Sequence, residues 1–118
     1  TITMPADLVG FYLSSELTDD EDWHGIHNGG TTAASTTTTD VDLNDDAVAG
    51  EWQVLRLEVA SDGTTTWWID GVLKQTVTAA CSTTTNLAAV LACGANTTEL
   101  VIMDVDYMLV EANRDWTV

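Results

Sequence analysis

Residues 52–78 read WQVLRLEVASDGTTTWWIDGVLKQTVT, and this stretch decides the fold class. Two Asp-Gly pairs, Asp62-Gly63 and Asp70-Gly71, divide it into three segments rich in apolar and β-branched residues. An Asp-Gly pair accepts the positive φ angles that tight hairpin turns require. The stretch therefore predicts a meander of three antiparallel strands, which lie at Trp52–Ala60, Thr64–Ile69 and Val72–Thr78.

The chain on either side of this meander shows the same short apolar segments, separated by Gly, Asp, Asn, Ser and Thr. Helical periodicity is nearly absent, so these segments favour strands. Five further strands are predicted at Leu8–Leu13, Trp23–His27, Asp40–Leu43, Leu87–Ala92 and Leu100–Glu111. Eight short strands without helices predict an all-β protein, an antiparallel β-sandwich or barrel. Strand alternation also predicts that Trp52 and one of the pair Trp67 and Trp68 face the core.

Length and charge limit the function. The chain has 118 residues, of which 45% are hydrophobic, and this suits one domain over residues 1–118 with its own core. Three Lys and Arg face nineteen Asp and Glu, so the net charge is −16. Nucleic-acid binding and attachment to anionic membranes are excluded, because both need a basic surface. No apolar run is long enough to cross a bilayer.

The ends and the cysteines leave alternatives open. The chain does not begin with Met and shows no signal peptide, so it is either a processed product or a piece of a longer protein. Cys81 and Cys93 are the only cysteines. They form either a disulfide that closes a hairpin or two buried free thiols. Their spacing has no metal-site signature.

Three elements, taken in order, resemble the concanavalin A-like jelly rolls of the laminin G and glucanase type. These are the strand Trp52–Val59, the hairpin around Trp67–Gly71, and the final segment Met103–Glu111 with its Asp106-Tyr107 pair. The resemblance covers about half the chain and implies an antiparallel jelly-roll sandwich. Domains of that family are longer, so the sandwich is either reduced or lacks its first strands. The Glu-x-Asp-x-x-Glu strand of the glucanases is absent, which implies a protein that is not an enzyme.

A second resemblance links the chain to structural proteins of tailed bacteriophages. The stretch from Phe11–Leu13 through Asp22–Asn28 is similar to a passage in the jelly-roll domains of capsid decoration and tail-associated proteins. It implies a non-enzymatic virion module at the virion surface. The partners implied are copies of the chain itself and a virion shell or tail protein. Because identical acidic copies repel, we expect stability to rise with salt or Ca²⁺.

The most concentrated group of ionisable residues runs from Asp19 to His27. Asp19, Asp20 and Asp22 are candidate Ca²⁺ ligands, since Ca²⁺ accepts several carboxylates in flexible geometry. The alternative is a solvated acidic turn before a strand. The spacing is not that of an EF-hand, because His24 stands where the loop needs Gly. No nucleophile motif accompanies the histidines, so no hydrolytic site is predicted.

The five tryptophans suggest a second function. Trp rings stack on sugars, so Trp23 and Trp68, with His24 and His27 beside the first of them, are candidate glycan-binding residues. The alternative function is therefore an extracellular or phage carbohydrate-binding, lectin-like domain that depends on Ca²⁺. The competing interpretation places most of these tryptophans in the core.

Overall fold

A computed structural model describes residues 5–35, 40–95 and 101–112 of the chain. The chain divides into two units, Thr1–Leu87 and Ala88–Val118, and each is described by itself. The described residues contain strands and no helix, which confirms the all-β fold class. No described segment forms a helix with the length and apolar character needed to cross a membrane. A single domain over residues 1–118 stays a prediction.

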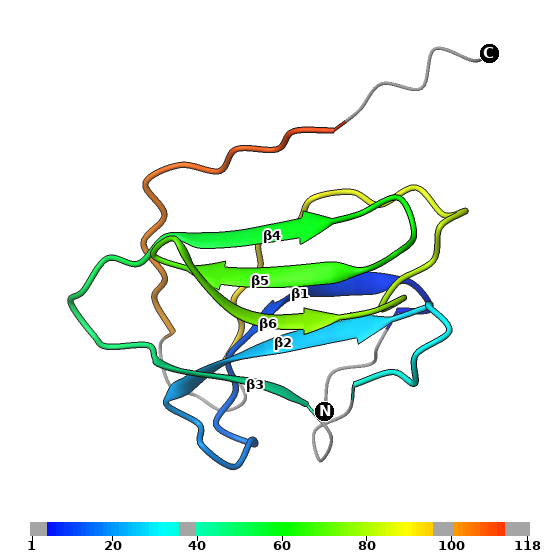
Figure 1. Cartoon of the computed structure of the whole chain (residues 1–118). Helices are drawn as coiled ribbons and strands as arrows, with labels where there is room; N and C mark the ends of the chain where they lie inside the picture. Colours follow the sequence, from blue (N-terminus) through cyan, green and yellow to red (C-terminus); the bar gives the residue numbers. More distant parts are fainter. Residues whose placement is uncertain (1–4, 36–39, 96–100, 113–118) are drawn as a thin grey trace. The chain divides into compact units, whose positions relative to one another are not determined.

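The first unit contains six strands in two three-stranded antiparallel sheets (Figure 1). The first sheet has the order β1-β2-β3 and the second has the order β4-β5-β6. The strands are β1 (Leu8–Tyr12), β2 (Asp22–Asn28), β3 (Val41–Asp46), β4 (Leu55–Val59), β5 (Thr65–Ile69) and β6 (Val72–Val77). Strands β1 and β4–β6 lie inside the predicted ranges, and β4–β6 are the meander predicted from residues 52–78. Strand β2 extends one residue beyond its predicted range at each end, and β3 continues three residues beyond Leu43.

Both Asp-Gly turns are confirmed, with different geometries. Asp70 and Gly71 have φ angles of 49° and 79°, and they join Ile69 to Val72 as a two-residue turn. At the other hairpin only Gly63 has a positive φ, 80°. There the Gly63 N–H donates to the carbonyl of Ala60 over 2.9 Å. This pattern belongs to a three-residue hairpin loop that ends on a glycine.

Trp67 is the centre of the core. It is 0% exposed, and its indole Nε1 donates to the carbonyl oxygen of Gly10 in β1 over 2.8 Å. Leu43 of β3 and Ile69 of β5 complete the buried cluster. Partly buried side chains around it are Phe11, Trp23, Val41, Leu55, Leu57 and Val77. Since these residues come from both sheets, the two sheets share one core.

Gly25 of β2 makes this close packing of the sheets feasible. A Cβ atom at this position would lie 2.9 Å from Cε2 of Trp67 and 3.1 Å from Cβ of Val41. Both distances are shorter than ordinary van der Waals contact, so a side chain here would collide with the indole. Glycine in the middle of a strand often marks such a close approach.

The prediction for Trp52 is wrong. Its side chain is 69% exposed, whereas Trp67 takes the inward position in the meander. The reason is the start of β4, which lies at Leu55 and not at Trp52. Residues 51–54 belong to the connection between the sheets, so strand alternation does not govern the direction of Trp52.

The two C-terminal strand predictions are also wrong for the described residues. Residues 87–92 and 101–111 form no strand, and Leu100 lies outside the described residues. Their apolar composition favours a strand, but a strand also needs a neighbour to pair with its N–H and C=O groups. No described strand pairs with either segment.

Cys81 and Cys93 are both free thiols, and because they belong to different units the disulfide between them stays a prediction. Cys81 is buried, and its Sγ atom lies 3.8 Å from the carbonyl oxygen of Gly63. Cys93 is exposed, so the expectation of two buried thiols holds for one of them only. Cys81 therefore contributes to the core of the first unit as a small apolar residue.

Candidate functional site

The predicted acidic residues occupy the turn that leads into β2. Asp19 has a positive φ of 33°, and its carbonyl oxygen accepts a hydrogen bond from the N–H of Asp22 over 3.1 Å. Asp20 is exposed in the same turn, and Asp22 is the first residue of β2. Asp is tolerated at positive φ more readily than most residues, so the sequence suits this turn.

Asp22 lies opposite Asp46 where β2 pairs with β3. The pKa of Asp22 is raised from 3.8 to about 6. The largest cause is the hydrogen bond between the two side chains, followed by partial burial and by the negative charges of Asp42, Asp46 and Asp19. Two carboxyl groups this close cannot both ionise freely, so the pair retains a proton at pH values well above those at which an ordinary aspartate loses its proton.

The raised pKa of Asp22 predicts a pH-dependent stability. Because the folded pKa exceeds the unfolded one, the contribution of Asp22 is complete below about pH 4 and is lost as the pH rises through about 6. With solvent screening at this partly exposed site, we expect a loss of about 1 kcal/mol. Urea unfolding at several pH values, in the presence of a chelator, measures it.

The control for this experiment is Asp22→Asn, which removes the titrating carboxyl. The stability difference between the wild type and Asp22→Asn should shrink or reverse as the pH rises from about 4 to about 7. Asp20→Asn changes an exposed carboxyl of the same turn and should show no such trend. A constant difference between wild type and Asp22→Asn across this range would contradict the proton-sharing pair.

Among the described residues, no three His, Cys, Asp or Glu side chains are arranged to hold a metal ion. The negative charge of Asp19 acts on Asp22, because it contributes to the raised pKa of Asp22. Asp20 is exposed and is not among the causes of that shift. The Ca²⁺ site at Asp19, Asp20 and Asp22 stays a prediction.

His24 joins the acidic turn to β2. It is 2% exposed, and its Nε2 atom lies 3.0 Å from the carbonyl oxygen of Asp19. Its Nδ1 atom contacts the Asp40 carboxylate, although without hydrogen-bond geometry. Both ring nitrogens therefore face acceptors from the chain itself, and the histidine stabilises the local structure.

His27 lies deeper in the sheet and is 4% exposed. Its ring packs against Trp67 with 6.4 Å between the ring centroids. The backbone N–H of His27 donates to the Ser35 hydroxyl over 2.8 Å. The backbone N–H of Ser35 in turn donates to the carbonyl oxygen of His27 over 3.0 Å. The Nδ1 atom has no hydrogen-bond partner among the described residues. These contacts place His27 in the core of the first unit.

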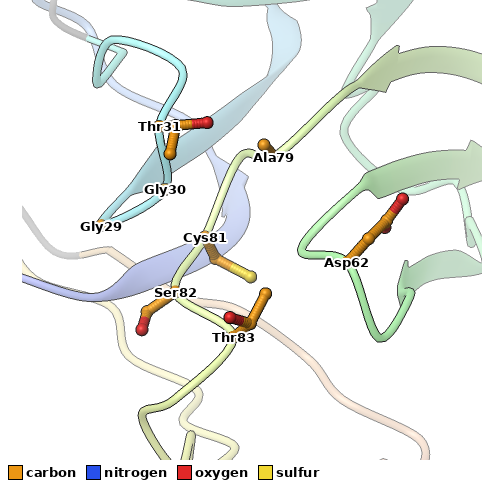
Figure 2. A pocket seen from close by; sticks show the side chains of 8 residues that line it. All are labelled: Gly29, Gly30, Thr31, Asp62, Ala79, Cys81, Ser82 and Thr83. Carbon is orange, nitrogen blue, oxygen red and sulfur yellow. The ribbon is translucent and has the colours of Figure 1, made fainter.

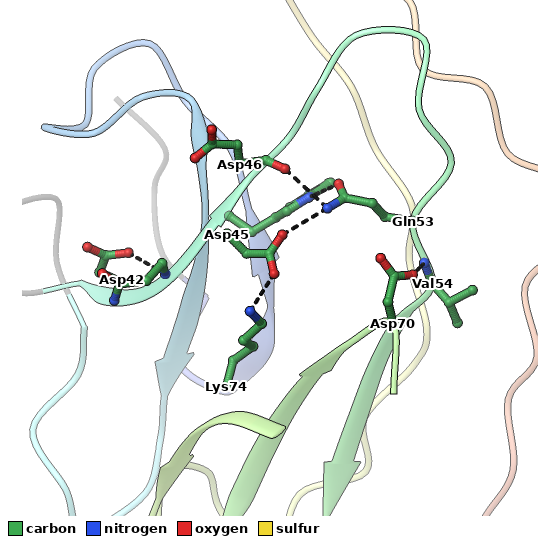
Figure 3. A network of polar contacts seen from close by, with 9 residues as sticks. Asp42, Asp45, Asp46, Gln53, Val54, Asp70 and Lys74 are labelled. Atoms are coloured by element: carbon green, nitrogen blue, oxygen red, sulfur yellow. Dashed lines mark hydrogen bonds and ion pairs between the residues drawn. The ribbon is translucent and has the colours of Figure 1, made fainter. Parts of the chain in front are cut away.

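Sequence reasoning missed a polar network around Gln53 and Asp45 (Figure 3), in which Trp23 also takes part. The Nε1 atom of Trp23 donates to Oε1 of Gln53 over 2.8 Å. The amide nitrogen of Gln53 donates to Oδ1 of Asp45 over 3.0 Å and to the carbonyl of Asp46 over 3.1 Å. Lys74 of β6 forms an ion pair of 2.5 Å with the same Asp45 carboxylate. The network therefore links β2 and β3 of one sheet to β6 of the other.

Trp68 lies on the outer face of β5, opposite to the buried Trp67. Arg56 of β4 lies over its ring, 5.4 Å from the centroid, and also forms an ion pair with Glu58. The indole Nε1 donates to the hydroxyl of Thr66 over 3.1 Å. A sugar stacked on this ring would compete with the guanidinium group for the same face.

The structure does not bring the four predicted glycan residues together. His24 and His27 are buried, Trp23 packs against the core in an edge-to-face contact with Phe11, and Trp68 lies on an outer sheet face. Of the four, Trp68 is the residue that a ligand approaching the outer face of this sheet would meet. A glycan site at these residues stays a prediction.

A shallow pocket of about 200 Å³ lies beyond the end of β2 (Figure 2). Its walls are the loop after β2, the β4–β5 turn and the segment after β6. Lining residues are Gly29, Gly30, Thr31, Asp62, Ala79, Cys81, Ser82 and Thr83. Hydrogen bonds from Thr64 lower the pKa of the exposed Asp62 carboxyl. A single carboxylate and a buried thiol do not form a recognisable catalytic group.

Comparison of the chain with protein-family models, with curated proteins and with solved structures finds no match.

Proposed function

We propose that this chain is a non-enzymatic structural module that acts through protein–protein assembly, with a concanavalin A-like jelly-roll sandwich as its fold. The observation that supports this most is the exposure of apolar side chains in residues 101–110. Ile102 and Leu109 are 72% and 71% exposed, and Val101, Met103, Val105, Tyr107, Met108 and Val110 are exposed as well. Soluble proteins rarely leave contiguous apolar surface uncovered unless a partner covers it.

The finer proposal is a virion component, either a capsid decoration or a tail-associated protein. It rests on the resemblance of the segments Phe11–Leu13 and Asp22–Asn28 to such proteins. The partners proposed are copies of the chain and a virion shell or tail protein, at the virion surface or in the extracellular space. The two described cations, Arg56 and Lys74, already face carboxylates, so a net charge of −16 resists self-association unless salt screens it.

Self-association that strengthens with salt is the expected result. Analytical ultracentrifugation of the full chain should show more association at about 1 M than at about 0.1 M NaCl, because the screening length falls from about 10 Å to about 3 Å. Free energies of unfolding should rise over the same range. A chain that stays monomeric at high protein concentration in all of these conditions would contradict an assembly function that relies on copies of itself.

The carbohydrate-binding alternative is kept because of Trp68, whose ring is partly accessible on an outer sheet face. A glycan array with added Ca²⁺ tests it, and Trp68→Ala is the variant to compare with the wild type. Loss of binding in Trp68→Ala would favour the lectin-like function. An array without binding in Ca²⁺ would remove this alternative.

A further inference from the structure

The pair Asn28-Gly29 lies at the end of β2 and differs chemically from the surroundings of the other asparagines. Of the five asparagines in the chain, Asn28 is the one that glycine follows. A side-chain amide can react with the main-chain nitrogen of the next residue, and a Cβ atom on that residue hinders the approach. Gly29 has no Cβ, so its nitrogen is open to the Asn28 side chain.

Two hydrogen bonds hold the Asn28 side chain beside this nitrogen. The Gly29 N–H donates to Oδ1 of Asn28 over 2.9 Å, and Nδ2 of Asn28 donates to the carbonyl oxygen of Pro5 over 2.7 Å. The two bonds agree on which side-chain atom is the oxygen and which is the nitrogen. They keep the Gly29 nitrogen next to Cγ, the carbon that carries Oδ1. Reacting groups held together in this way gain the advantage of an intramolecular reaction.

The Gly29 nitrogen lies just outside the β1–β2 ladder. The pair of Leu8 with Asn28 is the last of that ladder, and the Gly29 N–H donates to a side chain and not to a main-chain carbonyl of β1. Gly29 is exposed and has a positive φ of 99°, a conformation that suits glycine. A nitrogen inside the ladder would have to break a strand hydrogen bond before it reacted. The Gly29 nitrogen breaks only the contact with its own reaction partner.

We propose that Asn28 is a site of spontaneous deamidation, in which the Gly29 nitrogen displaces the side-chain amide and forms a cyclic imide. Hydroxide takes the proton of the Gly29 N–H, and the nitrogen forms a bond to Cγ of Asn28. The Cγ–Nδ2 bond then breaks, and Nδ2 leaves as ammonia with a proton from water. Water opens the ring at either carbonyl carbon, which yields aspartate or isoaspartate at position 28. The overall reaction consumes a water molecule and releases ammonia.

The product changes the contacts at the end of β2. A carboxylate in place of the amide has no N–H for the Pro5 carbonyl, and it adds a negative charge to a chain that already carries −16. The Asp7 carboxylate lies against Gly29, because its Oδ1 atom occupies the place of an added Cβ there. Like charges therefore face each other next to the lost hydrogen bond. We expect the segment before β1 to detach from the end of β2.

Isoaspartate has a further effect, because its main chain runs through the side-chain carbons and is therefore longer. The loop after β2 has little room for this shift at Gly30, where an added Cβ would overlap the carbonyl of Ala79. The Thr32 N–H donates to the same carbonyl over 3.2 Å. Isoaspartate should therefore loosen the contact between this loop and the segment after β6, where the pocket lies.

Peptide mapping of the full wild-type chain by mass spectrometry tests the site. At about pH 8, deamidation at Asn28 should be at least about tenfold faster than at Asn44 and Asn86, which are exposed but precede residues with a side chain. The rate should rise roughly tenfold per pH unit, because hydroxide removes the proton. The folded chain should react at Asn28 within about fivefold of the rate in urea, since no strand has to open first. A larger protection by the fold would overturn the proposal.

Asn28→Gln tests the chemical route, because it keeps the amide but lengthens the side chain and so disfavours ring closure. Anion-exchange chromatography should show the gain of a negative charge in the wild type and in Asn44→Gln, and none in Asn28→Gln over the same time. Electron-transfer fragmentation should find isoaspartate as well as aspartate at position 28. A charge gain that persists at the wild-type rate in Asn28→Gln, or aspartate without isoaspartate, would overturn the cyclic imide at this site.

Discussion

Trp67→Ala is expected to destabilise the first unit by about 4 kcal/mol, enough to unfold a domain of ordinary stability. The indole is fully buried between the sheets, and the Gly10 carbonyl would lose its side-chain donor. Alanine would therefore leave a large cavity and an unsatisfied acceptor. Urea unfolding followed by circular dichroism measures the loss.

Trp52→Ala is the matched control, because it makes the same change in a side chain that is 69% exposed. It should alter the free energy of unfolding by no more than about 0.5 kcal/mol. Similar losses in the two variants would contradict a core centred on Trp67. A small loss of stability in Trp67→Ala would also contradict a core centred on Trp67.

Gly25→Ala is expected to cost about 1–3 kcal/mol, although it adds only one methyl group. The new Cβ would lie 2.9 Å from the Trp67 ring and 3.1 Å from Val41, and neither neighbour is a flexible chain end. Gly10→Ala is the control in the neighbouring strand, where the nearest atom to an added Cβ is 3.7 Å away. Thermal and urea unfolding of both variants should separate them clearly.

A double variant tests the physical cause. Trp67→Phe shortens the ring that the new methyl group would meet, so Gly25→Ala should cost less in that background than in the wild type. Additive losses would show that the effect of Gly25→Ala comes from the strand backbone and not from the collision. The two predictions thus test the same contact from its two sides.

Local signals explain why the meander could be predicted. Asp62-Gly63 and Asp70-Gly71 encode their turns within a few residues, and the strands between them follow from composition. Which tryptophan faces the core could not be read from the same stretch. Alternation places Trp67 and Trp68 on opposite faces but does not say which face of the sheet meets the other sheet. It gave a wrong direction for Trp52 because β4 begins at Leu55, after that residue.

The failures in the C-terminal part have a different cause. Strand formation over residues 87–92 and 101–111 depends on a partner strand, and sequence composition carries no information on whether one is present. Residues 101–110 have the apolar composition of a strand and still form none among the described residues. Propensity alone therefore could not decide its conformation.

The candidate site was predicted in part. The acidic turn before β2 could be located from sequence, but the raised pKa of Asp22 depends on Asp46 in another strand. His24 and His27 are three residues apart and lie on opposite faces of β2, so the burial of His24 depends on Asp19 and Asp40 and that of His27 on Trp67. Gln53 joins Trp23 of β2 to Asp45 of β3, and a lone glutamine in a connecting segment has no sequence signal that would have identified it.

The segment after β6 has a mechanical consequence. The N–H groups of Ala80 and Cys81 both donate to the carbonyl oxygen of Gly63, and the Thr32 N–H donates to the carbonyl of Ala79. These bonds tie the chain to two loops immediately after the last strand. A force applied to the chain on the C-terminal side of Cys81 would act on these hydrogen bonds before it acted on β6. The hydrogen bonds between β5 and β6 would therefore not be the first to break.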